Sequence, residues 1–201
     1  MTVPFDHIGE AYDEAFSDRE AQREHGRRLI TALPAGARVL DHGCGSGVPT
    51  ARQLVDAGFE LVGVDESERM LTLARERVPE ARFERRDLRD LGEDLGEFDA
   101  VVSYFALLML PRSEIPGVLS GIAGRLRPGG LLALGMVAGD FDDVEIPFVN
   151  GVPIRVSAYP TAAELAEVVS GAGFEVTSSE EVGVPSERGV ETQQFVLARR
   201  A

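Results

Sequence analysis

The chain has 201 residues, 44% of them hydrophobic, and a formal net charge of −14 at pH 7. This length and hydrophobic content suit one α/β domain with a full core, and so acidic a surface argues against a nucleic-acid partner, because it repels phosphates. A single cysteine excludes an internal disulfide, and the three histidines are too widely separated to suggest a metal cluster.

The N-terminal segment, residues 1–35, is predicted to be helical. Ser17 is expected to cap a helix over residues 19–33, with Glu20 completing a capping box. The first ten residues lack the basic patch and the apolar stretch of a secretion signal, and no apolar run approaches the roughly 20 residues that cross a bilayer. The sequence therefore predicts a cytoplasmic protein that does not engage a membrane.

Three glycines at alternate positions follow the first predicted strand, residues 37–42. Gly43, Gly45 and Gly47 lack a Cβ, so a ligand can approach the main chain closely there. A second predicted strand, residues 61–65, ends in Asp65, and an acid at that tip is placed to accept hydrogen bonds from ribose hydroxyls. Together these features predict a pocket for an adenosyl group.

The glycine spacing distinguishes between nucleotide cofactors. A dinucleotide fold needs G-x-G-x-x-G, but the last position is Val48 when counted from Gly43 and Thr50 when counted from Gly45. A nicotinamide-dependent oxidoreductase is therefore disfavoured. Alternating glycines can also form no more than a tight turn, so the cofactor interpretation depends on the preceding strand, on Asp41 and on Asp65.

Strands and helices alternate along the rest of the chain. One helix is predicted to begin near Pro49 and another at Ser67, and the almost continuously apolar residues 98–104 predict a strand buried on both faces. The other expected elements are strands at 82–85, 131–137, 174–182 and 194–199, helices at 112–126 and 161–171, and a turn at 128–130. This alternation predicts a largely parallel sheet with right-handed crossovers.

Residues 140–160 interrupt that alternation. Asn150-Gly151 between apolar residues predicts a short hairpin, and Pro147 and Pro153 keep its strands out of a sheet centre. We expect this excursion to lie over the strand ends, the edge at which open α/β sheets bind ligands. A solvent-facing hairpin without a role is the alternative.

The motif D-x-G-x-G-x-G, formed by Asp41 and the three glycines, resembles the first motif of the class I S-adenosylmethionine-dependent methyltransferases. Further stretches along nearly the whole chain resemble the small-molecule members of this family: 5–8, 11–14, 63–67 with 70–71, 86–88, 98–105, 126–130, 171–176 and 195–200. The resemblance implies an α/β, Rossmann-like fold with a seven-stranded, mostly parallel sheet in the order 3-2-1-4-5-7-6, strand 7 antiparallel, and helices on both faces. It implies a single domain over 1–201, with 1–35 as a helical lid and 140–160 as a substrate-side cap.

The resemblance also implies a set of side chains and loop positions that bind S-adenosyl-L-methionine. They are Tyr12, Asp41, Gly43, Cys44, Gly45, Gly47, Asp65, Glu66, Met70, Asp87, Leu88, Ser103 and Phe105. Three of them have structural alternatives: Met70 as plain core, Asp87 as the cap of a turn, and Tyr12 as packing.

Methyl transfer from a sulfonium needs a general base only when the acceptor must lose a proton. The candidate bases are His7, His42 and Tyr159, with Tyr104 as an orienting group. His42 stands where the family usually has an aliphatic residue, and alternation along its strand favours a buried, hydrogen-bonded role for it instead. No metal ion is expected.

The sequence thus predicts methyl transfer to a small, secondary-metabolite-like acceptor, at oxygen, nitrogen or carbon. Strand 98–104 is followed by no Asn-Pro-Pro-Tyr string, which argues against an amide or adenine nitrogen as acceptor. The apolar side chains of the cap would suit an aromatic or polyketide-like ligand, and Arg155 could pair with an acidic group on it. These apolar side chains are Phe141, Ile146, Phe148, Val149, Ile154 and Tyr159. The alternatives are a protein that binds the cofactor or its demethylated product without catalysis, and a cofactor-assisted enzyme of another reaction class. A homodimer is left open.

Overall fold

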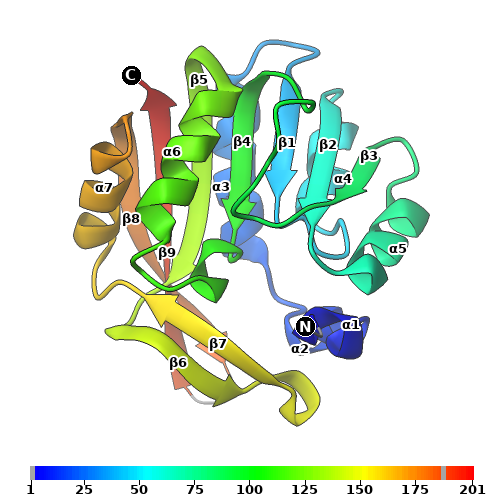
Figure 1. Cartoon of the computed structure of the whole chain (residues 1–201), viewed down its shortest axis with the longest axis vertical. Coiled ribbons are helices and arrows are strands. Elements are labelled where there is room, and N and C mark those ends of the chain that lie inside the picture. Colours follow the sequence, from blue (N-terminus) through cyan, green and yellow to red (C-terminus); the bar gives the residue numbers. More distant parts are fainter. Residues whose placement is uncertain (1–2, 187–188) are drawn as a thin grey trace.

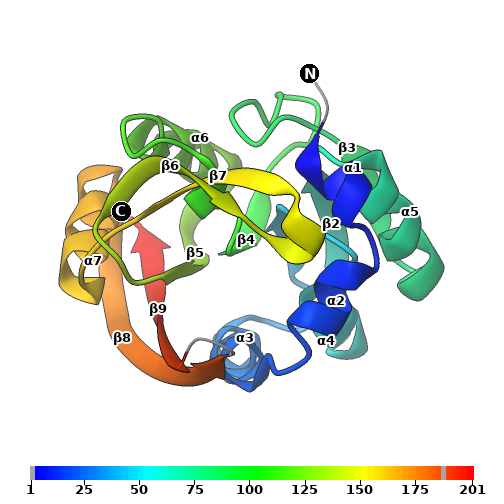
Figure 2. The ribbon, with the colours of Figure 1, turned by 90° about the horizontal axis from the view of Figure 1, so that it is seen from below.

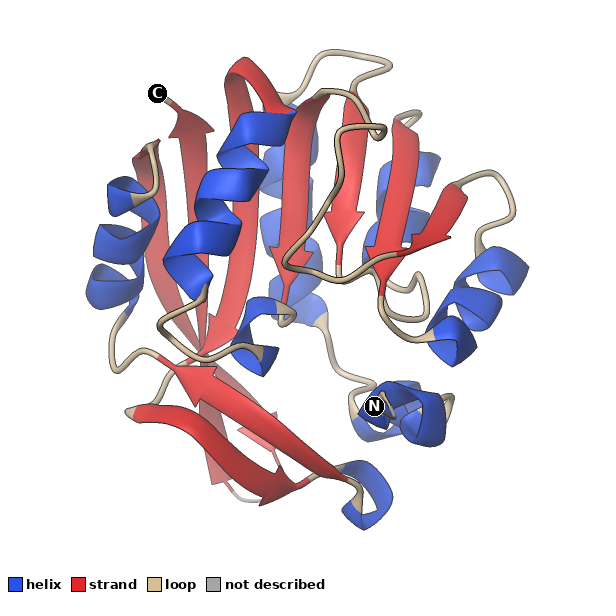
Figure 3. Cartoon of the chain, viewed as in Figure 1, coloured by secondary structure: helices blue, strands red, loops and turns tan. Residues whose placement is uncertain are grey.

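The computed structural model describes residues 3–186 and 189–201. A seven-stranded sheet forms its centre, in the order β3-β2-β1-β4-β5-β9-β8 (Figures 1 and 3). Its strands are β1 (Arg38–His42), β2 (Glu60–Asp65), β3 (Arg82–Arg85), β4 (Phe98–Tyr104), β5 (Leu126–Val137), β8 (Phe174–Ser186) and β9 (Gly189–Arg200). The strands β1 to β5 pair in parallel, and β9 runs antiparallel to both β5 and β8. The predicted sheet order and its antiparallel strand are confirmed.

Helices cover both faces of the sheet (Figures 1 and 2). The helices α3 (Glu20–Ala32), α4 (Thr50–Asp56) and α5 (Glu68–Arg77) lie on one face, and α6 (Ile115–Arg125) and α7 (Ala162–Gly171) on the other. Each face has its own cluster of buried side chains, with Leu54 and Val102 in one cluster and Val101 and Leu119 in the other. Successive residues of β4 enter opposite clusters, which is why this strand is apolar almost throughout.

The helix starts confirm one predicted cap and correct another. Ser67 caps α5, and its hydroxyl accepts a hydrogen bond from the Met70 N–H at 3.2 Å. Ser17 does not cap α3. The N-cap residue is Arg19, which makes no side-chain cap, and the carboxylate of Asp18 accepts from the Glu20 N–H instead.

Other differences lie where local sequence signals are weak. The strands β8 and β9 extend well beyond the predicted 174–182 and 194–199, because the hairpin continues through residues such as 191–194 that are polar and give no hydrophobic strand signal. Helix α6 begins three residues later than predicted, after a short 3-10 turn, η1 (Leu107–Met109). The expected turn at 128–130 lies within a bulge at the start of β5, where the pairing with β4 shifts register.

Two additional segments lie at the sheet edge where β1, β2 and β4 end (Figures 1 and 2). One contains the short helices α1 (Pro4–Ile8) and α2 (Ala11–Ala15). The other is the predicted hairpin, β6 (Phe141–Pro147) paired with β7 (Pro153–Ala158) through the turn η2 (Val149–Gly151). Asn150 and Gly151 take φ angles of 55° and 74°, the left-handed conformation that these two residue types tolerate best. Within the described residues, no helix is both long and apolar enough to cross a membrane.

Candidate active site

The glycine loop after β1 holds its main chain against β2. Gly43, Gly45 and Gly47 all have left-handed φ angles, of 79°, 52° and 80°. The N–H groups of Gly43 and Cys44 both donate to the Val64 carbonyl, each at 2.9 Å. A Cβ on Gly43 would lie 2.3 Å from that of Ala106, whereas one on Gly45 would meet no protein atom within 4 Å. Gly43 thus permits a close contact within the protein, and Gly45 keeps space open beside the loop.

Asp65, at the end of β2, joins this loop to helix α5. One of its carboxylate oxygens accepts from the Gly45 N–H and the other from the Ser67 N–H, both at 2.9 Å. Burial raises the pKa of Asp65, while these N–H groups act in the opposite direction. A carboxylate has about four lone-pair sites, so Asp65 can accept further hydrogen bonds from a ligand.

Asp41 is a second buried acid at the same edge. Its side chain is 2% exposed, and its Oδ2 has no hydrogen-bond partner among the described residues. Burial, followed by the charge of Asp65, raises the pKa of Asp41 to about 8. Buried polar atoms are rarely left unpaired, so this oxygen indicates a place for a donor group of a ligand.

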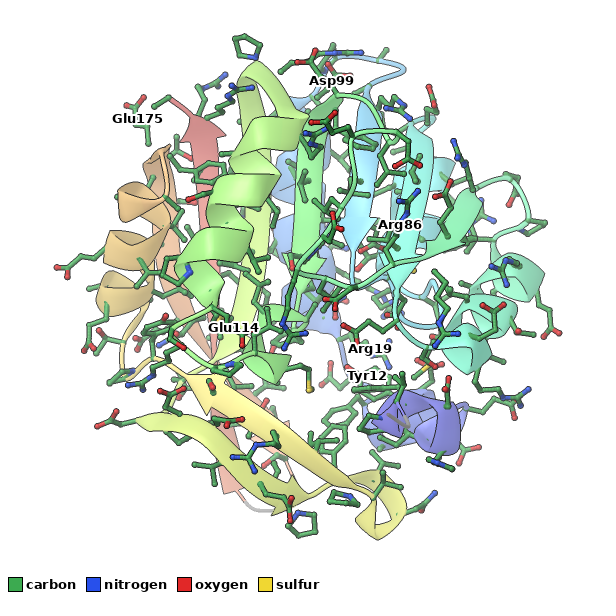
Figure 4. All side chains as sticks on the ribbon, viewed as in Figure 1. Tyr12, Arg19, Arg86, Asp99, Glu114 and Glu175 are labelled. Atoms are coloured by element: carbon green, nitrogen blue, oxygen red, sulfur yellow. The ribbon has the colours of Figure 1, made fainter. Side chains whose placement is uncertain are left out.

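A cavity of about 430 Å³ lies against the glycine loop, and we call it the loop cavity. Ten of the thirteen predicted cofactor residues line it: Tyr12, Asp41, Gly43, Cys44, Gly45, Asp65, Glu66, Met70, Leu88 and Phe105. Tyr12 comes from helix α2, so the N-terminal segment forms one wall (Figure 4). A ribose-binding carboxylate, bare main chain and an unpaired buried acid fit the hydroxyls and the ammonium group of S-adenosylmethionine.

Three predicted cofactor residues do not line the loop cavity. Gly47 packs against α5, where a Cβ would lie 3.2 Å from Ala74. The exposed Asp87 accepts from the Arg89 N–H at 2.8 Å, which is the turn-capping alternative. Ser103 is buried beside His42. The packing or local hydrogen bonds of these three are the contacts that the structure shows for them, and their cofactor roles stay predictions of the sequence.

A second cavity, of about 210 Å³, adjoins the first, and we call it the apolar cavity. Its walls are largely aromatic and aliphatic side chains: Tyr12, Phe16, Phe105, Leu108, Met109, Val137, Phe141, Ile146, Phe148, Ile154 and Val156. Six residues line both cavities: Tyr12, Arg19, Gln22, Phe105, Met109 and Ile154. Phe105 has a φ of 58°, a conformation that costs an aromatic residue energy and tends to occur at functional sites. The two cavities therefore meet beside this strained aromatic residue.

Aromatic rings from the two additional segments cover this junction. Phe148, beside the hairpin turn, stacks on Phe16 with ring centroids 5.4 Å apart and lies 6.3 Å from Tyr12. The N-terminal segment is also fastened to α5, because the Ser67 hydroxyl donates to the Asp6 carboxylate at 2.7 Å. The N-terminal segment and the hairpin thus contact each other through these rings, and we call the ring cluster Tyr12, Phe16 and Phe148 the roof.

Of the predicted cap side chains, Phe141, Ile146, Phe148 and Ile154 line the apolar cavity, whereas Val149 and Tyr159 do not. Arg155 is already paired, with its Nε 2.6 Å from an Asp143 oxygen, so the proposed pairing with a ligand acid is not supported. Arg112 anchors the base of the hairpin. It donates to the Ala158 carbonyl at 2.6 Å, and its guanidinium lies 5.1 Å from the centroid of the Tyr159 ring.

His42 is not available as a general base. Its Nε2–H donates to the Leu88 carbonyl at 2.9 Å, so Nδ1 accepts from the Ser103 hydroxyl at 3.1 Å. Burial lowers the pKa of His42 to about 4, which keeps the ring neutral. The structure thus contradicts the catalytic prediction and agrees with the buried, hydrogen-bonded alternative.

The other predicted catalytic residues are also not placed as bases. His7 is exposed on α1 and lines neither cavity. Tyr159 lines neither cavity, because its ring packs under Arg112. Tyr104 does line the loop cavity, but its hydroxyl shares a hydrogen bond of 2.8 Å with His25 Nδ1, and burial raises its pKa far above the ordinary range. Tyr104 therefore remains a protonated phenol bound to His25.

Sequence reasoning missed several polar residues at these cavities. Gln22 lies at the junction and donates to Thr50 at 2.7 Å, and Glu191 and Gln193 line the apolar cavity from β9. His25 is fully buried beside Tyr104, with its Nε2 unpartnered among the described residues. Gln22 and His25 lie three residues apart within α3 and so share one face of the helix, and this spacing is the signal that could have found these two. In the part of the chain that the structure describes, no group of His, Cys, Asp and Glu could hold a metal ion.

Comparisons with known proteins agree with this geometry. Residues 39–130 match the family described as "Methyltransferase domain". The trans-aconitate 2-methyltransferase of Variovorax paradoxus is 40% identical over 109 residues, which are 52% of this chain and 40% of that protein. The chain spans about half the length of the curated relatives that it matches.

Two solved structures illustrate the shared fold. The 1,6-didemethyltoxoflavin-N1-methyltransferase of Burkholderia thailandensis has a TM-score of 0.73 at 23% identity, covering 100% of this chain and 92% of that one. The cyclase SpnF has a TM-score of 0.71 at 21% identity, covering 90% of this chain and 82% of that one. At these identities the likeness establishes the fold alone.

Proposed function

Since the chain belongs to the class I S-adenosylmethionine-dependent methyltransferases, we propose that it transfers a methyl group to a small molecule held in the apolar cavity. The observation that carries this proposal is the meeting of the two cavities at Tyr12, Phe105 and Met109. One cavity has the donors and acceptors that suit the cofactor, and the other has the mostly apolar lining that suits an organic acceptor.

The described residues perform binding, orientation and the exclusion of water. When bound, S-adenosylmethionine supplies an electrophilic methyl group on a positively charged sulfur. We assign Asp65 to the ribose hydroxyls and Asp41 to the ammonium group, because their free lone pairs face the loop cavity. The roof around Phe148 holds the acceptor against the junction, and such alignment contributes much of the rate in a displacement that needs little other help.

The protonation state of the acceptor follows from what lines the junction. The titratable residues common to both cavities are Tyr12 and Arg19. Burial raises the pKa of the Tyr12 phenol, and Arg19 is a cation, so neither can accept a proton near neutral pH. We therefore propose an acceptor atom that is nucleophilic without the help of a base at the junction, such as a neutral nitrogen or an activated carbon.

The same observation favours one second candidate. A protein that binds the cofactor beside an organic ligand without transferring methyl, or that catalyses another reaction with it, also needs no base at the junction. The fold neighbour SpnF is named as a cyclase, not as a methyltransferase. The homodimer and the cytoplasmic location stay predictions of the sequence.

The test measures binding and turnover separately. Titration calorimetry with S-adenosylmethionine and S-adenosylhomocysteine tests the loop cavity. Incubation with a panel of apolar nitrogen and carbon nucleophiles, followed by assay of S-adenosylhomocysteine release, tests methyl transfer. Binding with product release supports the proposal. Binding with conversion of the partner compound but no release supports the second candidate, and absence of binding would reject both.

A further inference from the structure

The apolar cavity has only a few polar side chains in its lining. Among its aromatic and aliphatic walls lie Asp18, which precedes α3, Gln22 from the first turn of α3, and Glu191 and Gln193 from β9. On β9, Glu191, Gln193 and Phe195 lie at every second position and so share one face. The Phe195 ring lies 6.0 Å from that of Phe105 at the junction. One face of β9 thus leads from the junction to a carboxylate.

The carboxylate of Glu191 is oriented by a neighbouring amide, and no cation among residues 3–186 and 189–201 pairs with it. The Gln193 side chain donates to it at 3.2 Å, which fixes one oxygen. None of the ion pairs formed by the described residues includes Glu191 or Asp18. Asp18 is exposed and sits at the rim, whereas Glu191 is half-buried. A carboxylate beside apolar walls gains most from a ligand that brings its own positive charge.

Arg19, the cation that lines this cavity, already donates its hydrogen bonds to acceptors of the protein. Arg19 donates from its Nε to the Phe16 carbonyl and from Nη2 to Asp13, both at 2.7 Å, and from Nη1 to the Val48 carbonyl. Its side chain is 11% exposed. A carboxylate on a ligand would therefore have to break these bonds or lie unpaired beside Glu191, and both alternatives cost free energy.

We infer that the acceptor is a hydrophobic molecule that carries an ammonium group, with its apolar body between Phe105 and Phe148 and the ammonium donating to Glu191; the atom that receives the methyl group is a second, unprotonated nucleophile of the same molecule, at the junction. This inference rests on the proposed function and names the substrate class of the same site. In this inference Glu191 determines the specificity for the acceptor. The chain would then differ in substrate charge from its trans-aconitate 2-methyltransferase relatives, because trans-aconitate is a polycarboxylate. Trans-aconitate is expected to be neither bound nor methylated.

The test uses three probes of one size: 2-naphthylmethylamine, 2-naphthalenemethanol and 2-naphthoate. Each is titrated calorimetrically into the full chain saturated with S-adenosylhomocysteine. We expect the amine to bind about tenfold or more tightly than the naphthoate, as befits a charged hydrogen bond, with the alcohol between them. An alcohol or a naphthoate that binds as tightly as the amine would overturn the inference.

Matched variants identify the residue responsible. In Glu191→Gln the ratio of amine to naphthoate affinity should fall to about threefold or less, because the charge is lost but one acceptor oxygen is kept. Glu175→Gln makes the same charge change on β8, far from Tyr12 and Arg19 (Figure 4), and should leave the ratio unchanged. A ratio in Glu191→Gln equal to that of the parent chain would reject the role of Glu191.

A parallel set of titrations without S-adenosylhomocysteine separates the two proposals. If the chain binds the amine selectively but not S-adenosylhomocysteine, the proposed function fails while the inference about the apolar cavity stands. If it binds S-adenosylhomocysteine but does not discriminate among the probes, only the inference fails.

Discussion

The N–H of Gly45 donates to the Asp65 carboxylate at 2.9 Å, across a separation of 20 residues in the chain. The bond joins the glycine loop after β1 to the end of β2, so both walls of the loop cavity depend on one side chain. Its other oxygen is held by the Ser67 N–H, which fixes the plane of the carboxylate relative to helix α5. Orientation by two backbone donors is the feature that prepares Asp65 to receive a ligand.

Replacing Asp65 should remove cofactor binding by two routes. Asp65→Ala deletes the acceptor for the ligand and leaves the N–H groups of Gly45 and Ser67 without a partner. Hydrogen bonds to a charged group contribute roughly 1.5–3 kcal/mol each, so we expect affinity for S-adenosylhomocysteine to fall about 100-fold. Asp65→Asn keeps one acceptor oxygen and should lose less.

Titration calorimetry measures these affinities, and urea unfolding checks that the variants are folded. Asp87→Ala is the control, since Asp87 is exposed and outside both cavities. An Asp65→Ala protein that binds as tightly as the parent chain would refute the assignment.

Two neighbouring glycines should respond differently to the same substitution. Gly43→Ala places a Cβ 2.3 Å from that of Ala106 in a left-handed conformation, so we expect a loss of about 2–5 kcal/mol in unfolding free energy. Gly45→Ala meets no protein atom and should lose only the conformational cost, about 1–2 kcal/mol. The added methyl group of Gly45→Ala instead enters the loop cavity and should weaken cofactor binding. Urea unfolding and calorimetry together check both effects, and equal losses of stability would contradict the geometry.

Local sequence signals predicted the parts of the site that depend on local structure. The predicted strand at 37–42 with the glycines after it indicates where β1 ends, and Asp65 indicates where β2 ends. Parallel pairing brings both ends to one edge of the sheet. The alternation along β1 also favoured a buried partner for His42 over a catalytic role, and its bonds to Leu88 and Ser103 agree.

The remainder of the site depends on contacts between distant segments. Glu191 and Gln193 reach the apolar cavity because β9 continues beyond its apolar core, an extension that its polar sequence did not indicate. Asp65 is the last residue of β2 and Asp87 lies two residues after β3, but the Asp87 carboxylate accepts from the nearby Arg89 N–H. The hydrophobic pattern of the sequence does not distinguish the acid that lines the loop cavity, Asp65, from the acid that caps a turn, Asp87.

Arg112 should control the hairpin without affecting the cofactor. Arg112→Met keeps much of the side-chain volume but removes the bond to the Ala158 carbonyl, the pair with Asp140 at 3.0 Å and the cation over Tyr159. We expect faster amide hydrogen exchange over residues 141–158 and a higher KM for the acceptor, with unchanged affinity for S-adenosylhomocysteine. Arg127→Met, which breaks a pair with Asp99 at the opposite end of β4 (Figure 4), is the control. Equal loss of cofactor affinity and acceptor binding would show that the hairpin does not act as a separate cap.

The buried Asp41 should make the stability of the protein depend on pH with a defined sign. Its pKa is about 8 in the native state and about 3.8 in the unfolded chain, so the native state holds a proton that the unfolded state releases between these values. Stability from this group is therefore complete below about pH 4 and decreases as pH rises toward 8, by up to about 1.4 kcal/mol per pH unit. The neutral, buried His25 and His42, each with a pKa of about 4, act in the opposite direction below about pH 6.5.

Because both histidines are present in Asp41→Asn as well, their contribution cancels when that variant is compared with the parent chain. Urea unfolding at pH 6.5 and 8 should show Asp41→Asn gaining up to about 2 kcal/mol relative to the parent over this interval. A constant difference would mean that Asp41 is ionised throughout, and that its unpaired oxygen is held by a donor that is present before any ligand binds.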